Sequence, residues 1–281
     1  MEIRPILSAL LRSKTGAILV ALQVAISLAI LANALHIVNV RQAVTARPSG
    51  IASESDMVFV QIRHLVKADH NAQMALQKTE TAALRALPGV ASVAFVSQIP
   101  LSYSGGYNSV AADPKQTRPS ANVSDYMSPD SAVQTWGLKL LEGRDYRPDE
   151  VIEVDRNATP DAFPKVLLVT RATARKVWPG AASVVGKMLY MGTGPGSSSA
   201  RVIGVVERLQ TVQGELGEVG ELSMLIPMRL SNEGTTYAIR TAAGQRELVM
   251  RETESALRKT NGAGQPIIVR IKPFTQIRSE R

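Results

Sequence analysis

The sequence predicts an α+β protein in which one N-terminal transmembrane helix precedes a two-part folded domain. Three features carry this prediction: an apolar run at residues 17–40, two strand–helix–strand patterns at residues 57–96 and 236–271, and several short strand patterns between them. The 281-residue chain is 45% hydrophobic and 20% charged, which is typical of a folded protein. It has no cysteine, which excludes disulfides and thiolate metal sites.

The apolar run contains no Asp, Glu, Lys or Arg. As a helix rising about 1.5 Å per residue it extends about 36 Å, enough to cross a hydrocarbon core of about 30 Å. Arg4, Arg12 and Lys14 precede the run, so the positive-inside rule places the N-terminus in the cytoplasm. We therefore expect a single-pass membrane protein whose folded domain lies on the side away from the cytoplasm.

Two alternatives to a membrane anchor remain. Ala32-Asn33-Ala34 fits the small-x-small cleavage site of a signal peptide, but the run exceeds the usual signal-peptide core of about 7–15 residues and continues through Ile37 and Val38. A buried core helix is the other alternative, although so long an uncharged run suits lipid better. With an anchor or a signal peptide, the rest of the chain is exported.

The first residues carry an apolar stripe with members at i, i+3, i+4, i+7 and i+8. These members are Ile3, Ile6, Leu7, Leu10 and Leu11. The spacing predicts a short basic amphipathic helix within residues 1–16, lying in the cytoplasmic interface of the membrane. An ordinary cytoplasmic segment without this helix is the alternative.

Two parts of the exported region share one order of elements. The first has strand, helix and strand patterns at residues 57–63, 71–87 and 90–96. The second has them at residues 236–240, 246–259 and 267–271, with a Gly-rich turn at residues 261–266. We expect these two units to pack together as halves of one α+β subdomain.

Short strand patterns predominate between the two units. They fall at residues 122–126, 138–146, 166–169, 188–191, 201–206 and 223–228, with short helices at 128–136 and 171–177. We interpret residues 188–206 as a hairpin and residues 149–160 as a loop. The predicted division is a cytoplasmic helix at 1–16, a transmembrane helix at 17–40, a first subdomain at 48–139 and 231–273, and a β-rich insertion at 140–230.

Glycine-rich motifs indicate turns rather than phosphate binding. Residues 180–187 (GAASVVGK) resemble a phosphate-binding loop, but five residues separate the two glycines where four are needed. Met188 also stands where that motif has the Mg²⁺-binding Ser or Thr. We interpret this segment as a turn and residues 192–196 as a flexible hairpin tip.

Titratable residues give no chemical site either. His36, His64 and His70 have no partner at metal-ligand spacing. An acidic cluster lacks the Gly-centred spacing of a calcium loop, and we interpret it as a solvated loop. Its members are Asp145, Asp149, Glu150, Glu153 and Asp155. We therefore predict no catalytic, cofactor-binding or metal-binding residues and no enzyme activity.

The net charge of +8 does not indicate nucleic-acid binding. The basic residues form no single block, and no aromatic residues interleave with them as a stacking platform requires. Part of the positive charge instead flanks the apolar run.

Five segments then follow one another in a characteristic order. They are residues 87–93 (LPGVASV), 123–146 ending in WGLKLLEGRDY, 173–180 (TARKVWPG), 185–187 (VGK) and 201–206 (RVIGVV). With the N-terminal helix, they resemble the MacB-like periplasmic core domain of ABC-transporter permeases, the class that includes MacB, FtsX and the lipoprotein-releasing permeases. The most characteristic stretch has the form G-x-x-L-x-x-G-R-x-F and corresponds to residues 137–146.

The resemblance implies a bacterial inner-membrane protein whose periplasmic domain combines a porter-like α+β subdomain with an inserted β-rich one. It also implies that this chain is not the ATPase, because a separate or fused nucleotide-binding domain hydrolyses ATP in the cytoplasm. The implied partners are the lipid bilayer, an ATP-binding subunit that contacts the amphipathic helix, further permease chains and a periplasmic adaptor protein. No cofactor is implied for this chain.

The sequence departs from the family in its membrane part. The family places three more spans after the core domain, whereas this sequence stops at Arg281. Because one helix cannot form the membrane unit of a permease, we expect a truncated fragment or a half-permease that relies on other chains. The alternative function is a single-span, membrane-anchored periplasmic binding or assembly module without an ATPase, and a third hypothesis is a secreted enzyme.

Overall fold

The computed structural model describes residues 14–66, 68–155, 163–231, 234–260 and 267–280. The chain divides into two compact units between Arg47 and Pro48. The predicted amphipathic helix at residues 3–11 and the predicted turn at residues 261–266 lie outside the described residues.

The first unit consists mainly of helix α2 (Lys14–Ala46), which is 33 residues long. Its apolar window has a mean hydropathy of 2.3 and contains no buried residue, and Ile18, Leu28 and Val38 are all exposed. Within the described part of the chain, it is the one helix long and apolar enough to cross a membrane. A helix that is apolar on every side suits lipid. The structure therefore fits a single-pass membrane protein.

The first sheet of the second unit interleaves the two strand–helix–strand units. Its order is β13 (Ile267–Pro273), β1 (Met57–His64), β12 (Gly234–Thr241) and β2 (Val90–Phe95), with every neighbouring pair antiparallel. Each strand of one unit adjoins only strands of the other, which is the arrangement of split β-α-β repeats. This topology confirms that the two units form one α+β layer.

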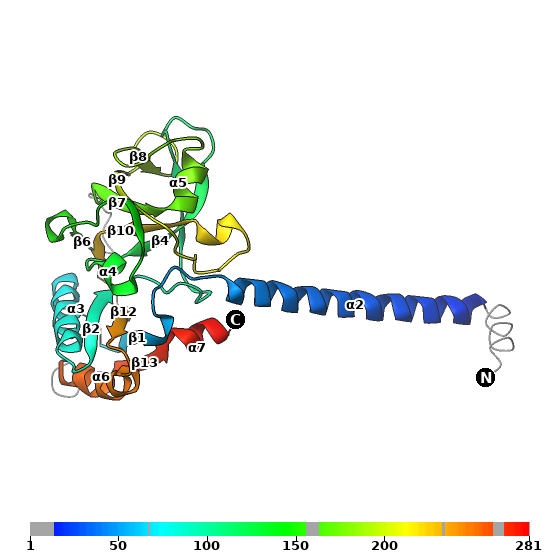
Figure 1. Ribbon diagram of the computed structural model, residues 1–281, viewed down its shortest axis with the longest axis horizontal. Helices are drawn as coiled ribbons and strands as arrows, with labels where there is room; N and C mark the ends of the chain where they lie inside the picture. The colour runs from blue at the N-terminus through cyan, green and yellow to red at the C-terminus, as the bar shows by residue number, and fades with distance from the viewer. Residues whose placement is uncertain (1–13, 67, 156–162, 232–233, 261–266, 281) are drawn as a thin grey trace. The chain divides into compact units, whose positions relative to one another are not determined.

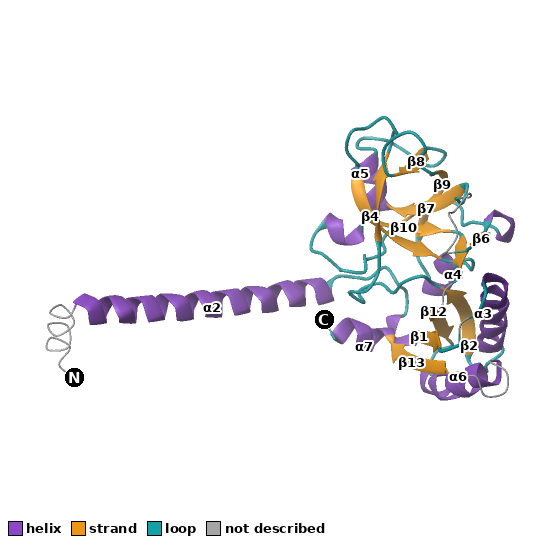
Figure 2. Ribbon diagram, turned by 180° about the vertical axis from the view of Figure 1, so that it is seen from behind, coloured by secondary structure: helices purple, strands orange, loops and turns teal. Residues whose placement is uncertain are grey.

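Two helices cover one face of this sheet. They are α3 (His70–Arg85) and α6 (Arg246–Thr260), which pack against each other (Figures 1 and 2). Helix α3 begins where Asp69 accepts a hydrogen bond from the Ala72 N–H at 2.8 Å. Alternate residues of the strands face these helices and form a buried apolar core with them. Its members are Val58, Val60, Ile62, Leu84, Val93, Phe95, Tyr237, Ile239, Val249, Leu257 and Ile267.

The opposite face of the first sheet is covered only at one end. Helix α4 (Ala132–Trp136) contacts β2 and β12, and helix α7 (Phe274–Ser279), which the sequence analysis missed, contacts β1 and β13. The ring centroids of Phe59 and Phe274 are 5.7 Å apart. Gly137 caps α4 with φ +59°, and a Cβ there would lie 2.3 Å from Arg240 Nη2, so only glycine fits without a shift.

The second sheet closes on itself. Its seven strands run in the order β5-β9-β7-β10-β4-β3-β8, and β8 also pairs with β9, so six strands form a ring with β5 attached. The strands are β3 (Tyr107–Ala111), β4 (Ala121–Met127), β5 (Leu140–Gly143), β7 (Val166–Thr170), β8 (Met188–Met191), β9 (Ser199–Val206) and β10 (Ser223–Ile226). The antiparallel β8–β9 pair confirms the predicted hairpin.

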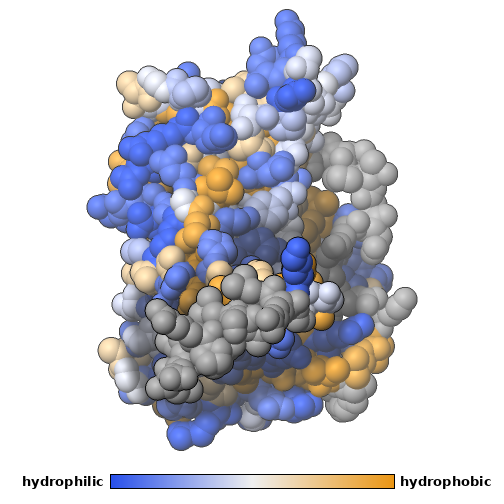
Figure 3. Space-filling view, turned by 90° about the vertical axis from the view of Figure 1, so that its right-hand side faces the viewer, coloured by the Kyte–Doolittle hydropathy of each residue, from blue (hydrophilic) through white to orange (hydrophobic). Residues whose placement is uncertain are grey.

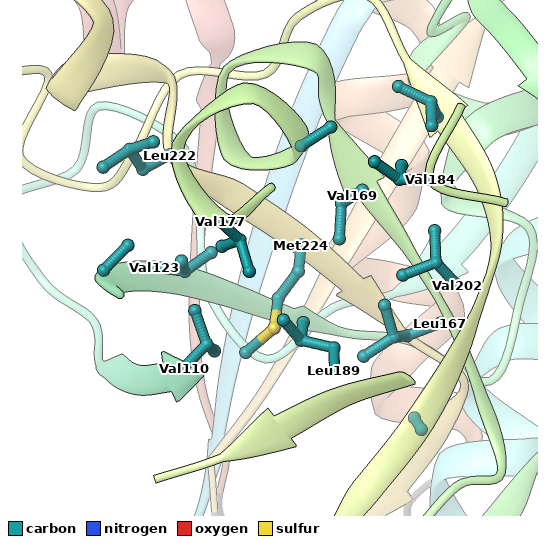
Figure 4. Close-up of a cluster of buried hydrophobic side chains, with 14 of the residues drawn as sticks. Val110, Val123, Leu167, Val169, Val177, Val184, Leu189, Val202, Leu222 and Met224 are labelled. Atoms are coloured by element: carbon teal, nitrogen blue, oxygen red, sulfur yellow. The ribbon is translucent and has the colours of Figure 1, made fainter. Parts of the chain in front are cut away.

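Apolar side chains fill the interior of this ring, as in other small barrels. Leu167, Leu189 and Met224 are fully buried there, beside Val177 of helix α5 (Arg171–Val177), which covers one end (Figure 4). On the face of the molecule that Figure 3 shows, hydrophilic side chains predominate, with hydrophobic patches between them.

Two details differ from the sequence analysis. Residues 149–160 were expected to form a loop, yet they include a 3₁₀ turn (Pro148–Glu150) and strand β6 (Ile152–Val154), which pairs with β11 (Met228–Leu230). Strand β6 is only three residues long and its partner is distant in sequence, so no local pattern indicates it. Strands β3 and β4 belong to the second sheet although they precede residue 140. The predicted boundaries of the two subdomains stay a proposal.

Candidate functional site

Two glycine-rich segments considered in the sequence analysis form turns. The segment at residues 180–187 forms turns between α5 and β8, and residues 192–196 connect β8 to β9, as expected. No group of three or more metal-ligating side chains gathers anywhere in the described ranges. The five predicted ATPase-contacting residues, Ile3, Ile6, Leu7, Leu10 and Leu11, lie outside those ranges.

His64 belongs to a buried polar cluster rather than to a metal site. Its Nε2 lies 3.1 Å from Oε1 of Glu80, whose side chain is fully buried in α3. The Tyr237 hydroxyl donates to Glu80 Oε2 at 2.7 Å. Burial, followed by the neighbouring Glu80 carboxylate, raises the pKa of Tyr237. The cluster joins α3 to strands β1 and β12 and is closed to solvent on the Glu80 side.

The carboxylates of the acidic cluster are paired, but Asp149 and Glu153 are also exposed, so its interpretation as a solvated loop is only partly wrong. Arg144 donates to both carboxylate oxygens of Glu150, at 2.7 and 2.6 Å, and this hydrogen bonding lowers the pKa of Glu150 to about 2. Asp145 accepts a hydrogen bond from Ser131 at 2.5 Å, and burial raises its pKa. Glu153 pairs with Lys78 at 2.7 Å. Asp145 and Glu153 thus join this segment to Ser131, which caps α4, and to Lys78 of α3.

The uncovered end of the first sheet holds the candidate site. Two adjoining hollows, of about 340 and 570 Å³, share Gln61 and Arg270 in their lining. We call the two hollows together the sheet groove. Its floor is formed by β1, β12 and β13, and its walls by the segment at residues 97–104 that follows β2 and, in the first hollow, by Ile277 of α7 and Glu280. Figure 2 shows β1, β12 and β13 side by side above α6.

Strand register makes the floor of the sheet groove basic. Gln61 lies opposite Arg270 and Arg63 lies opposite Ile268 in the β1–β13 pair. Because side chains alternate across a strand, these four share the face opposite the helix-covered core. Arg63 and Arg270 are exposed and have no ion pair within 4 Å in the described part of the chain. The groove therefore presents two neighbouring guanidinium groups.

The wall of the sheet groove is rigidly held. Leu101 and Tyr103 adopt φ values of +61° and +59°, an unusual conformation for bulky residues. Their N–H groups donate to the carbonyl oxygens of Thr211 and Val212, at 3.1 and 3.0 Å. The Ser102 hydroxyl also lies within hydrogen-bond distance of the Ile99 carbonyl, at 2.7 Å. These contacts fix the backbone at Tyr103, whose side chain lines the groove and is 55% exposed.

The composition of the sheet groove suits the binding of an anion, because guanidinium groups bind carboxylates and phosphates. This site could not be predicted from the sequence, because residues 61–63 and 267–271 have the patterns of ordinary strands. Only the pairing of β1 with β13 brings Arg63 and Arg270 onto one face, and that pairing has no local signal.

No family model matches the sequence, and no curated protein matches it. Similar solved structures include the periplasmic region of MacB from Actinobacillus actinomycetemcomitans, with 13% sequence identity, a TM-score of 0.49, and coverage of 84% of this chain and 96% of that one. They also include the extracellular domain of the noncanonical ABC-type transporter YknZ from Gram-positive bacteria, with 12% identity, a TM-score of 0.46, and coverage of 75% of this chain and 99% of that one.

Proposed function

We propose that the chain is a membrane-anchored permease component of an ABC-type export or mechanotransmission complex. It does not hydrolyse ATP, and its periplasmic domain couples to a substrate or a partner protein. The observation that carries the proposal is an apolar helix, with no buried residue in its membrane-length window, preceding a domain of interleaved strand–helix–strand units with an inserted barrel. This is the arrangement that the sequence motifs at residues 87–206 imply.

The start of the second unit suits the transfer of a mechanical load. Residues 48–54, which we call the leading segment, are fastened at both ends. The Gln210 side chain donates to the Pro48 carbonyl at 3.1 Å, and the Gln210 N–H donates to the Ser49 carbonyl at 2.9 Å. At the other end, Arg278 of α7 donates to Glu54. A pull on the leading segment would therefore reach two regions at once.

Close packing leaves the leading segment little freedom. A Cβ built on Gly50, which has φ +96°, would lie 2.2 Å from the Arg208 carbonyl oxygen. The Ala52 N–H donates to the Trp136 carbonyl at 2.9 Å, and the Ser49 hydroxyl donates to Glu54 at 2.6 Å. Close-packed protein has low compressibility and transmits strain. A displacement of the leading segment would therefore be passed on to the residues that hold it.

In the proposed complex, residues 1–16 lie in the cytoplasm and α2 crosses the bacterial inner membrane. The ATP-binding subunit contacts the apolar stripe at Ile3, Ile6, Leu7, Leu10 and Leu11. Further permease chains complete the membrane unit, and a periplasmic adaptor protein binds the second unit. Each of these assignments rests on the resemblance and on the positive-inside rule.

The absence of native cysteine allows a direct test of this topology. Ser8→Cys and Ser198→Cys variants are labelled in intact cells with a membrane-impermeant maleimide. We expect the Ser198→Cys variant to be labelled once the outer membrane is permeabilised, and the Ser8→Cys variant to be labelled only after lysis. The reverse pattern, or labelling of both in intact cells, would contradict the proposed orientation.

The contact with an ATP-binding subunit is tested by changing the stripe. Leu7→Glu places a charge on the apolar face, whereas Ser8→Glu places one on the polar face and serves as the matched control. We expect Leu7→Glu to reduce recovery of the ATP-binding subunit from membranes at least tenfold, and Ser8→Glu to leave it unchanged. Equal recovery of the ATP-binding subunit with both variants would contradict the proposed contact between this subunit and the apolar stripe.

A further inference from the structure

We infer that the sheet groove is a docking site for an extended, acidic segment of a partner polypeptide. This inference stands independently of the proposed transport role, because it rests on the charge and shape of the groove alone. The groove crosses β13, β1 and β12 and continues to the wall at residues 97–104. An extended chain laid across these strands would contact both hollows.

Charge complementarity indicates an acidic occupant. Arg63 and Arg270 are diagonal neighbours across the β1–β13 pair, since Arg63 lies opposite Ile268 and Arg270 is two residues further along. Like charges in such positions repel each other unless an anion lies between them. Elsewhere in the second unit most arginines have a carboxylate partner, whereas these two have no ion pair within 4 Å in the described residues.

The two other charges near the groove do not neutralise this pair. Lys272 and Glu280 bond to each other at 2.7 Å, and this contact is the main cause of the lowered pKa of Glu280. Arg270 adds only a weaker electrostatic effect on Glu280. Both guanidinium groups of the floor therefore remain available to a ligand carboxylate, which Arg binds in a bidentate manner.

The apolar groups favour a polypeptide over a small anion or a lipid headgroup. Ile268 lies beside the arginines with 54% of its surface exposed, and Tyr103 lies at the far hollow with 55% exposed. A segment with acidic residues between two apolar ones would match this order. The hydrogen-bonded wall fixes the backbone at Tyr103 before binding, so the wall itself does not have to become ordered when a ligand binds.

The test uses the full-length protein in detergent and a fluorescent peptide of leucine, glutamate and serine, with fluorescence anisotropy as the readout. A second peptide with glutamine in place of glutamate is the ligand control. We expect the glutamate peptide to bind at low salt and to weaken strongly at about 0.5 M salt. Arg63→Gln and Arg270→Gln should each weaken binding about tenfold.

Two controls separate the groove from the general positive charge of the protein. Arg251→Gln removes an exposed charge from α6, which covers the other face of the sheet, and should change affinity less than about twofold. The double variant Arg63→Glu/Arg270→Glu should reject the glutamate peptide and bind a lysine peptide of the same length. Thermal unfolding of each variant should match the wild type, because both side chains are exposed.

Three outcomes would overturn the inference. The first is an absence of binding to the glutamate peptide. The second is an equal loss of affinity with Arg251→Gln, which would indicate non-specific attraction. The third is displacement of the peptide by glycerol phosphate as readily as by unlabelled peptide, which would indicate a site for phosphate or a lipid headgroup.

Discussion

Arg278 Nη1 donates to both carboxylate oxygens of Glu54, lying 2.6 Å from Oε1, and so joins α7 to the leading segment. Both side chains are about one-fifth exposed, so water screens this pair less than it screens a surface pair. The contact fixes where the chain enters the first sheet relative to the helix that follows its last strand.

Removing this ion pair should weaken the second unit. We expect Glu54→Gln to lower the free energy of unfolding by about 1–2 kcal/mol, since it removes a charge-assisted, partly buried contact. Arg258→Ala is the matched control, because Arg258 pairs with Glu254 at 2.7 Å on an exposed helix surface and should contribute only about 0.3–0.5 kcal/mol. Urea unfolding of the full-length protein in detergent measures both. Equal losses in the free energy of unfolding would show that the Glu54–Arg278 contact stabilises the protein no more than an exposed ion pair does.

Gly50 should tolerate no side chain. Gly50→Ala forces an L-residue to φ +96° and places its Cβ against the Arg208 carbonyl, so we expect a loss of at least about 2 kcal/mol. Gly180→Ala is the control, because Gly180 also has positive φ, at +78°, but nothing lies within 4 Å of a Cβ there. That variant should lose only about 1 kcal/mol. Thermal unfolding compares them, and a smaller loss at position 50 than at position 180 would contradict the close packing of the leading segment.

The barrel interior should respond strongly to truncation. Leu189→Ala empties a fully buried position in the closed ring, and we expect a loss of about 2–5 kcal/mol. Leu141→Ala is the control, since Leu141 is 37% exposed on β5 at the outside of the ring and should lose less than about 1 kcal/mol. Similar losses in urea unfolding would indicate that residues 107–226 do not form a packed barrel.

The ionisation of Asp125 should contribute to the pH dependence of the free energy of unfolding. Burial raises the pKa of this carboxyl group to about 6 from 3.8. Between those values the folded protein binds more protons than the unfolded chain, so this group lowers stability as pH rises from about 4 to about 6. Asp125→Asn should therefore be more stable than wild type by up to about 3 kcal/mol at pH 7 and similar to it at pH 4.

Urea unfolding at a series of pH values checks this prediction. The quantity of interest is the difference between variant and wild type, because the pH dependence of all other groups then cancels. Asp145→Asn serves as a comparison. Burial also raises the pKa of Asp145, but the hydrogen bond that it accepts from Ser131 acts in the opposite direction. A difference curve for Asp125→Asn that stays flat from pH 4 to pH 8 would contradict the assigned pKa.

Local sequence patterns predicted the first sheet well and the second only in part. The strands near Met57, Val90, Thr236 and Ile267 were expected because β-formers alternate there and glycine or proline bounds them. Strand β3 was missed because Tyr107–Ala111 is short and follows a serine- and glycine-rich stretch. Closure of the ring was also not predictable, since it depends on β8 pairing with both β3 and β9.

The candidate site illustrates the same limit. Arg63 and Arg270 are far apart in sequence, and each occupies an ordinary exposed position of its own strand. Their proximity depends on which strands pair and in which register, and a shift of one residue would place them on opposite faces. The conformations of Leu101 and Tyr103 likewise depend on hydrogen bonds to Thr211 and Val212, which no local pattern indicates.

Purification of the full-length protein from the membranes of its native cell tests the central proposal most directly. The protein is extracted in mild detergent, and the chains recovered with it are identified by mass spectrometry, with a sample lacking residues 1–16 as the control. We expect an ATP-binding subunit and further membrane-spanning chains in near-stoichiometric amounts with the full-length protein. Recovery of the protein without any ATP-binding subunit would contradict the permease proposal and favour a membrane-anchored binding module.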